Sequence, residues 1–256
     1  LTKERLFDWH AALFPTGRSG MHPIIVGNWR TIHTGPMQVI SGPIGHEKIH
    51  FEAPRADKLK KEMSKFLDWF ENHNDIDPVL KAGIAHFWFV TIHPFEDGNG
   101  RIARAIADMA LARADKVADR FYSLSAQIER ERKAYYDHLE RQQRSNTDIT
   151  DWLSWFLDCL GHAITNAETT LGNVLFKANL WKKINHEPVN ERQRTVINRM
   201  LEDSFTGFMN TSKYAKLAKC SNDSALRDIR DLVSREIFIQ NEGGGRNTSY
   251  RLPEHE

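Results

Sequence analysis

Apolar residues recur at intervals of three and four along most of the chain, a pattern typical of amphipathic helices. It predicts a short helix over residues 3–13 and a series of helices from Pro54 onward. The stretch 77–92 carries almost no charge, so we expect a central helix that is buried nearly all round. Further helices are expected from residue 98, over 125–144 and from 152, with candidate breaks at Gly161 and Gly172.

Residues 15–54 lack this helical period and contain six glycines and five prolines. Extended structure is therefore expected in this part of the chain. Two short apolar runs on either side of Ser41-Gly42-Pro43 predict a hairpin over about residues 37–51. Because proline cannot donate to a strand ladder, we expect edge strands.

His186-Glu187-Pro188 interrupts the helical pattern and predicts a domain boundary, with one domain over 1–186 and a second over 188–256. In the second domain we expect helices at 191–202, 212–218 and 222–235, followed by two strands around Gly243-Gly244-Gly245. This order predicts a small winged helix-turn-helix domain.

Composition narrows the class of protein. The 256 residues are 40% hydrophobic and 27% charged, which is typical of a globular chain. Lys and Arg number 35 against 34 Asp and Glu, so any phosphate site must be local. Two distant cysteines, Cys159 and Cys220, argue against a disulfide framework. With no signal peptide and no long apolar run, we expect a cytoplasmic protein without a membrane partner.

The segment HPFEDGNGRIAR, residues 93–104, combines residue types that suit phosphate chemistry. Gly98 and Gly100 leave backbone N–H groups uncovered where a loop becomes a helix, and such a helix start binds anions. Asn99 can orient a phosphate oxygen through its amide. Arg101 and Arg104 lie one turn apart, so both can reach further phosphate oxygens.

Two further residues supply candidate chemistry. Asp97 offers a carboxylate for Mg²⁺, which binds through one or two carboxylates together with substrate phosphates. His93 ends the central helix and can accept a proton from an attacking hydroxyl. The segment therefore predicts phosphoryl or nucleotidyl transfer. A helix C-terminus raises the pKa of His93 and nearby arginines lower it, and the sequence does not decide between them.

Structural alternatives exist for each of these residues. Asp97 can cap the helix or pair with Arg101 four residues later, and Arg104 can pair with Asp108. A histidine at a helix end commonly binds free carbonyl groups. Their combination within twelve residues favours a functional site over these separate structural roles.

At every specified position, residues 93–104 match HxFx(D/E)GN(G/K)RxxR, the signature of the Fic family, and the chain resembles that family over about residues 1–185. The resemblance implies a mainly α fold, a Fic-type helical bundle with a β-hairpin flap. It implies transfer of AMP from ATP to a Ser, Thr or Tyr hydroxyl of a target protein, with release of pyrophosphate and with self-modification. In this reading His93 deprotonates the hydroxyl, Asp97 holds Mg²⁺ and Phe95 anchors the loop in the core.

The resemblance also implies binding surfaces. The second Tyr of the pair Tyr135-Tyr136 would border the adenosine pocket, with simple packing of both rings as the alternative. The flap would hold a target segment in extended form by backbone pairing. The nucleotide-binding residues implied are Gly98, Asn99, Gly100, Arg101, Arg104 and Tyr136. The implied flap comprises Met37, Gln38, Val39, Ile40, Ser41, Gly42, Pro43 and Ile44.

Two features concern the choice and control of the reaction. Gly100 is similar to the AMP-transferring branch, whereas the branch that transfers phosphate has Lys at this position. Many family members carry an inhibitory helix with the pattern (S/T)xxxE(G/N). The match at Ser125–Glu129 is followed by Arg130 and is read as accidental. We hypothesise that such a helix precedes Leu1, so that this fragment is derepressed and Arg104 is free.

The C-terminal domain leaves two interpretations open, DNA binding or docking of a protein, including homodimerisation. Ser221, Asn222, Ser224 and Arg227 could read base edges, and Arg246 could enter a minor groove, whereas Asp223, Asp228 and Asp231 would repel phosphates. A DNA-binding regulator whose motif only senses nucleotide is the alternative function. The HExxH pattern at 46–50 lies in a predicted strand, which argues against a zinc site.

Overall fold

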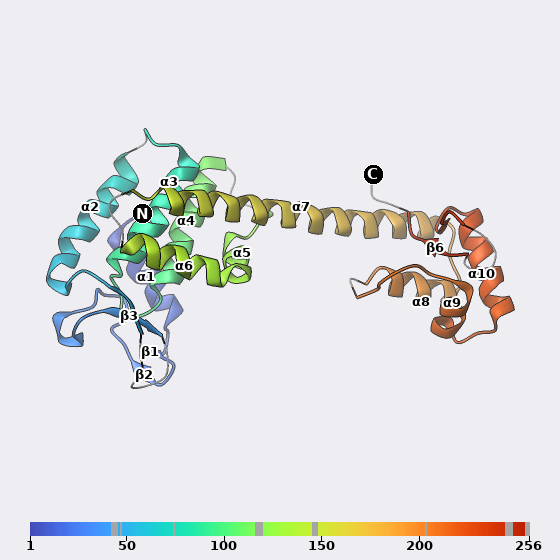
Figure 1. Ribbon diagram of the computed structural model, residues 1–256, viewed down its shortest axis with the longest axis horizontal. Helices are drawn as coiled ribbons and strands as arrows, with labels where there is room; N and C mark the ends of the chain where they lie inside the picture. Colours follow the sequence, from blue (N-terminus) through green and yellow to red (C-terminus); the bar gives the residue numbers. More distant parts are fainter. Residues whose placement is uncertain are drawn as a thin grey trace. The chain divides into compact units, whose positions relative to one another are not determined.

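A computed structural model describes residues 1–41, 46, 48–73, 75–115, 120–144, 148–202, 204–243 and 248–253. The chain divides into two compact units, unit 1 (Leu1–Ala167) and unit 2 (Glu168–Glu256). Each unit has a hydrophobic core of its own. Figure 1 shows that helices dominate both units, in agreement with the predicted mainly α fold. The predicted boundary at 186–188 lies inside unit 2.

Unit 1 is a bundle of helices in which α3 and α4 pack along each other (Figure 1). Gly83 on α3 lets another helix approach closely, because a Cβ there would lie 3.0 Å from both Leu153 and Phe156. The indole of Trp152 uses this approach and donates a hydrogen bond of 2.9 Å to the Gly83 carbonyl. The helices are α1 (Lys3–Leu13), α2 (Leu59–Asn72), α3 (Pro78–Ile92), α4 (Asn99–Asp115), α5 (Leu124–Arg130), α6 (Arg132–Gln143) and the first part of α7 (Thr150–His186).

The structure agrees with some of the predicted helix boundaries and differs from others. The helix expected over 77–92 is confirmed as α3, which Asp77 caps and which has Pro78 in its first turn. The single helix expected over 125–144 is interrupted at Glu131, where α5 ends and α6 begins. The breaks expected at Gly161 and Gly172 are absent, since α7 is continuous over Thr150–His186.

Short antiparallel strands occupy the segment between α1 and α2. Strands β1 (Arg18–Ser19) and β2 (His22–Pro23) form one pair, and β3 (Gln38–Ser41) and β4 (Lys48–Glu52) form another. The second pair has a bulge between Val39 and Ile40, so that His50 has no opposite residue. This pair overlaps the predicted hairpin at 37–51, with β4 ending one residue beyond it, while Gly42, Pro43 and Ile44 lie outside the described residues.

Unit 2 contains the last part of α7, three further helices and a strand pair. They are α8 (Glu191–Met200), α9 (Thr211–Ala218), α10 (Asn222–Ser234), β5 (Ile239–Gln240) and β6 (Tyr250–Arg251). The order agrees with the sequence pattern, and Asn210 caps α9. Whether the unit is a winged helix stays a prediction, since Gly244, Gly245 and Arg246 lie outside the described residues. None of the described helices is long and apolar enough to cross a membrane.

Candidate active site

His93 is positioned by the end of α3. It is the C-terminal cap of that helix and has a left-handed backbone, with φ of 51°. Its ring Nδ1 lies 3.1 Å from the carbonyl oxygen of Val90. Because a carbonyl can only accept, Nδ1 carries the proton and Nε2 carries the lone pair of the neutral ring. The residue is therefore held in the tautomer that a base acting through Nε2 requires.

The pKa of His93 is lowered from its ordinary value. Burial is the largest cause, and the positive charge of Arg30 acts in the same direction. The hydrogen bond to the Val90 carbonyl and the charge of Asp97 oppose this shift and are outweighed. The sequence left this balance open, and the arginine that contributes comes from the N-terminal segment rather than from the motif.

Arg30 ties the start of the motif loop to the rest of unit 1. It is only 3% exposed, and its Nε donates to the carbonyl oxygen of His93 at 2.8 Å. Its Nη2 donates to the carbonyl of Pro54, which follows β4. The backbone N–H of Arg30 also donates to the carbonyl of Pro94 at 2.9 Å. The buried guanidinium thus satisfies the carbonyl of His93 at the C-terminus of α3, and the backbone N–H of the same residue satisfies that of Pro94.

His10 of α1 supports the middle of the loop. Its ring is fully buried and stacks on Phe95 with a centroid separation of 4.1 Å. Nδ1 accepts from the N–H of Gly27 at 3.2 Å, so Nε2 carries the proton and donates to the carbonyl of Asp97 at 3.2 Å. Sequence analysis missed His10, although it is four residues after Leu6 and so lies on the predicted apolar face of that helix.

The side chain of Asn99 is engaged with the loop itself. Its Oδ1 accepts from the N–H of Phe95 at 2.9 Å, and its Nδ2 donates to the carbonyl of Phe95 at 2.8 Å. We expected this amide to orient a phosphate oxygen, but it is 2% exposed and closes the turn instead. Phe95 is fully buried, as predicted.

The first turn of α4 offers unsatisfied donors. Within the described part of the chain, the backbone N–H groups of Asn99, Gly100 and Arg101 have no acceptor, as is usual for the first residues of a helix. Gly98 has φ of 81°, and a Cβ there would lie 2.9 Å from the ring of Phe14. A Cβ on Gly100 would meet only Arg104, at 3.7 Å. The predicted anion site thus has open donors at a helix start.

The charged residues of the motif surround this helix start. Asp97 pairs with Arg101 at 3.6 Å, and its Oδ2 also accepts from the Ser19 hydroxyl at 2.5 Å. Arg101 lies over the ring of Phe14, 4.7 Å from its centroid. Arg104 has no carboxylate partner among the residues that the structure describes, because Asp108 pairs with Arg120 instead.

Tyr135 and Tyr136 differ strongly in environment. Tyr136 is 50% exposed on α6, whereas Tyr135 is buried and lies 3.0 Å from Nε2 of His86. Burial raises the pKa of Tyr135 well above its ordinary value. Simple packing therefore accounts for Tyr135 but leaves half of Tyr136 available for contact.

The remaining sequence candidates are dispersed. Met37 precedes β3, which contains the flap residues Gln38, Val39, Ile40 and Ser41. His50, the last residue of the HExxH pattern, lies in a strand, β4, and is bound to Glu140 of α6 at 2.5 Å.

In unit 2, Ser221, Asn222 and Arg227 are exposed near the start of α10, and Ser224 is half-buried there. Asp228 was expected to repel phosphates, but its side chain does not face solvent. It is 6% exposed and accepts two hydrogen bonds from Arg192.

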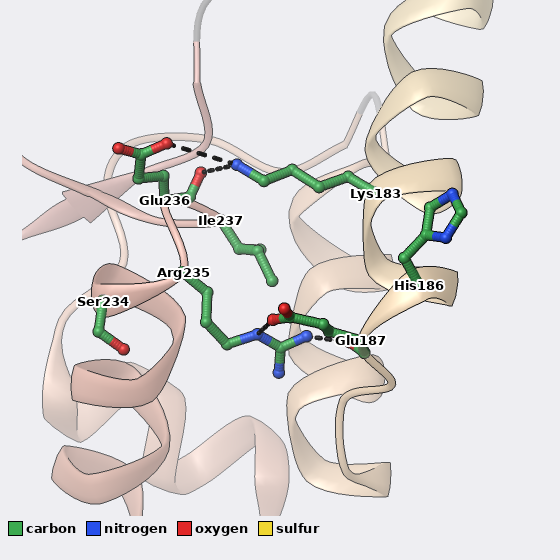
Figure 2. A pocket seen from close by; sticks show the side chains of 7 residues that line it. All are labelled: Lys183, His186, Glu187, Ser234, Arg235, Glu236 and Ile237. Carbon is green, nitrogen blue, oxygen red and sulfur yellow. Dashed lines mark hydrogen bonds and ion pairs between the residues drawn. The ribbon is translucent and has the colours of Figure 1, made fainter.

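A polar hollow of about 410 Å³ lies in unit 2 between the end of α7 and the residues after α10 (Figure 2). Its charges are paired with one another. Lys183 lies 3.6 Å from the Glu236 carboxylate, and Arg235 lies 3.6 Å from that of Glu187. These ion pairs join the elements that line the hollow, so it carries no sign of a ligand site.

The part of the chain that contains residues 93–104 is similar to known proteins. Residues 1–111 match the model of the Fic/DOC family. Among curated proteins, the chain is similar to protein adenylyltransferase Fic of Nematostella vectensis, with 32% identity over 115 residues, 43% of this chain and 25% of that protein. The protein of the same name from Culex quinquefasciatus is 34% identical over 108 residues, 41% of this chain and 20% of that protein.

These matches span about a quarter or less of the relatives' own length. Among solved structures, the chain is similar to a Fic family protein from Desulfovibrio desulfuricans, with a TM-score of 0.55 and 22% identity. That similarity covers 98% of this chain and 69% of the other, and it supports the fold.

Proposed function

We propose that this chain transfers AMP from ATP to a hydroxyl side chain of a target protein, and to hydroxyls of its own. The observation that carries the proposal is the pairing of two features in one loop. A neutral His93 presents its Nε2 lone pair, and the first turn of α4 presents backbone donors without acceptors. A base and an anion site separated by a few residues suit attack by a hydroxyl on a phosphate ester.

His93 acts as the general base in this proposal. The target hydroxyl attacks the α-phosphorus of ATP in line, and its proton passes to Nε2 while the bond to the pyrophosphate oxygen breaks. Because burial lowers the pKa of His93, the ring is neutral and able to accept a proton at neutral pH. The bond from Nδ1 to Val90 keeps the neutral ring in this tautomer until Nε2 accepts the proton.

The nucleotide is held by residues 98–104. The N–H groups of Asn99, Gly100 and Arg101 bind phosphate oxygens, and the side chains of Arg101 and Arg104 bind the end of the triphosphate. Gly100 leaves space for this because it has no Cβ. The half-exposed Tyr136 borders the adenosine. Positioning and charge stabilisation then supply most of the rate enhancement.

The Asp97 carboxylate and its surroundings fit a magnesium ion that binds together with the nucleotide. The carboxylate is 46% exposed; its Oδ2 contacts the Ser19 hydroxyl and the Arg101 guanidinium, and its Oδ1 accepts from the N–H of Gly98 at 2.6 Å. A single carboxylate is sufficient for Mg²⁺, which takes its other ligands from phosphates and water. Asp97 would hold the ion, which would neutralise charge on the phosphates.

The similar proteins support the type of reaction. The relatives from Nematostella vectensis and Culex quinquefasciatus are both named protein adenylyltransferase Fic. The family model covers residues 1–111, which include all of 93–104. A protein with a hydroxyl side chain is accordingly the acceptor that we propose.

A labelling assay tests this function. The chain is incubated with Mg²⁺ and ATP labelled on the α-phosphate, alone and with lysate proteins, and covalent label is measured together with intact mass. Wild type should gain the mass of AMP or transfer it, and His93→Ala should lower the rate by about 10² to 10⁴-fold. His33→Ala, an exposed histidine, is the matched control and should behave as wild type. Absence of label from wild type under all conditions would refute the proposal.

A further inference from the structure

We propose that Ser19 is a positioning residue for magnesium, and that it acts by holding the Asp97 carboxylate in one orientation. This inference rests on the proposed function and adds a residue from outside the motif to its metal site. Ser19 lies in β1, and its hydroxyl donates a hydrogen bond of 2.5 Å to Oδ2 of Asp97. The two residues are 78 positions apart in the sequence, so only the fold brings them together.

Hydrogen bonds hold Asp97 at its backbone and at both carboxylate oxygens. Nε2 of His10 donates to the backbone carbonyl at 3.2 Å, and the N–H of Gly98 donates to Oδ1 at 2.6 Å. The Ser19 hydroxyl holds the other oxygen, Oδ2. A carboxylate has about four lone-pair sites, so one hydrogen bond on each oxygen leaves a site open on both. The hydroxyl therefore orients the carboxylate and leaves it able to bind a metal ion.

Arg101 is a competing partner of the same oxygen. Its Nη2 lies 3.6 Å from Oδ2 of Asp97, and both side chains are nearly half exposed. An exposed ion pair of this length contributes little to stability. In the proposed function the Arg101 side chain binds the triphosphate, so its contact with Asp97 is given up when the nucleotide binds. The bond from Ser19 then remains to hold Oδ2. Without that bond, Arg101 would pair more closely with the carboxylate and compete with the metal ion.

Ser19 is also held in place by backbone contacts that do not involve its hydroxyl. Strand β1 pairs with β2, and the N–H of Ile24 donates to the carbonyl of Gly17 at 3.1 Å, which closes the base of this pair. The next residue, Ile25, donates its N–H to Oε2 of Glu96 at 2.8 Å, so the segment is fixed to the motif loop as well. Removal of the hydroxyl alone should leave this backbone in place, and its effect should fall on the metal site.

The size of the effect follows from the ligands that magnesium prefers. Loss of a residue that orients a metal ligand typically lowers metal affinity by about 10- to 100-fold. Mg²⁺ takes most of its ligands from substrate phosphates and water, and Asp97 would supply a single protein ligand. We therefore expect the lower end of this range for a change at Ser19.

Nucleotide binding with and without Mg²⁺ tests the inference. The full chain is titrated by calorimetry with an ATP analogue that has a methylene group between the α- and β-phosphorus and therefore cannot donate AMP. Ser19→Ala should raise the dissociation constant about tenfold in saturating Mg²⁺ and leave it within about twofold of wild type in EDTA. Thr16→Ala is the matched control, since it removes an exposed hydroxyl from the same segment and should bind as wild type does in both conditions.

Further variants show whether Ser19 acts through Asp97. If it does, Ser19→Ala added to Asp97→Ala should cause no further loss of affinity in Mg²⁺. Ser19→Thr and Ser19→Val form a second matched pair, because both side chains are β-branched, suit a strand and differ in one hydroxyl. Ser19→Thr should keep the affinity seen in Mg²⁺, and Ser19→Val should lose it. This pair also carries the test if Ser19→Ala does not fold.

Several results would overturn the inference. An unchanged affinity of Ser19→Ala in Mg²⁺ would do so, as would additive losses in the double variant or a wild type whose affinity does not respond to Mg²⁺. An equal loss in Mg²⁺ and in EDTA would assign Ser19 a purely structural role instead. Absence of label transfer by wild type would refute the proposed function, while the comparison of Mg²⁺ with EDTA would still decide the role of Ser19.

Discussion

His86 provides a sharp test of the energetics of unit 1. It is fully buried on α3, where Nε2 contacts the hydroxyl of Tyr135 at 3.0 Å and Nδ1 has no partner among the described residues. Burial is the main cause that lowers its pKa to about 3, and the charge of Arg104 adds to the shift. The substitution we consider is His86→Gln, which retains a side-chain donor for Tyr135 and cannot be protonated.

The magnitude follows from linkage between protonation and folding. In the unfolded chain His86 binds a proton near pH 6.5, whereas in the folded chain it does so only near pH 3. Its contribution to stability is therefore fully present above pH 6.5 and is lost as the pH falls toward 3. The loss begins near pH 6.5, so about two pH units count between pH 7.5 and pH 4.5. At about 1.4 kcal/mol per pH unit, this single group should lower the unfolding free energy of wild type by about 2.7 kcal/mol.

Urea unfolding followed by tryptophan fluorescence measures this effect, because six of the seven tryptophans lie in unit 1 and only Trp181 lies in unit 2. The loss of unfolding free energy between pH 7.5 and 4.5 should be smaller in His86→Gln than in wild type by about 2 to 3 kcal/mol. His33→Gln, at an exposed position, should retain the wild-type loss. An equal loss in wild type and His86→Gln would refute the argument that His86 is buried in its neutral form.

Two further predictions concern the motif loop. Arg30→Met removes a buried charge that lowers the pKa of His93, so the acid limb of the pH–rate profile should move to higher pH. The unfolding free energy should fall by about 2 to 4 kcal/mol. If the acid limb stays at the wild-type pH, the electrostatic role of Arg30 is excluded. Gly98→Ala places a Cβ 2.9 Å from the Phe14 ring at φ of 81°. It should lower the free energy of urea unfolding by about 1 to 3 kcal/mol and weaken ATP binding. Gly161→Ala, whose Cβ meets no atom within 4 Å, is the control and should reduce neither the unfolding free energy nor ATP binding.

The helical part of the fold was predictable because its signals are local. The helices over 3–13 and 77–92 were located from apolar spacing and from the near absence of charge in the second stretch, and both are confirmed. The break at Glu131 was not predicted, since neither Gly nor Pro marks it and the apolar spacing continues across it. Continuity at Gly161 and Gly172 was missed for the opposite reason, because an isolated glycine only weakens a helix.

The motif itself was visible in the sequence, but its supports were not. His10 and Arg30 act on backbone atoms of residues 93–97 from more than 60 residues away, and backbone acceptors leave no sequence pattern. The role of Asn99 was misjudged because an amide beside an anion site and an amide that closes a turn are the same residue type. Only the contacts with Phe95 distinguish these two roles.

The residues that hold the motif loop give a physical reason why the family match includes the N-terminal part of the chain. The loop of residues 93–98 is irregular backbone, and irregular backbone keeps one conformation only when its polar groups are bound. Its partners are His10, the N–H of Ile25, which donates to Glu96 at 2.8 Å, and Arg30, all within the matched residues 1–111. The N-terminal helix and the extended segment after it therefore support the candidate site as much as α3 and α4 do. Any fragment that retains α3 and α4 but lacks residues 1–30 should lose nucleotide binding even if both helices still pair.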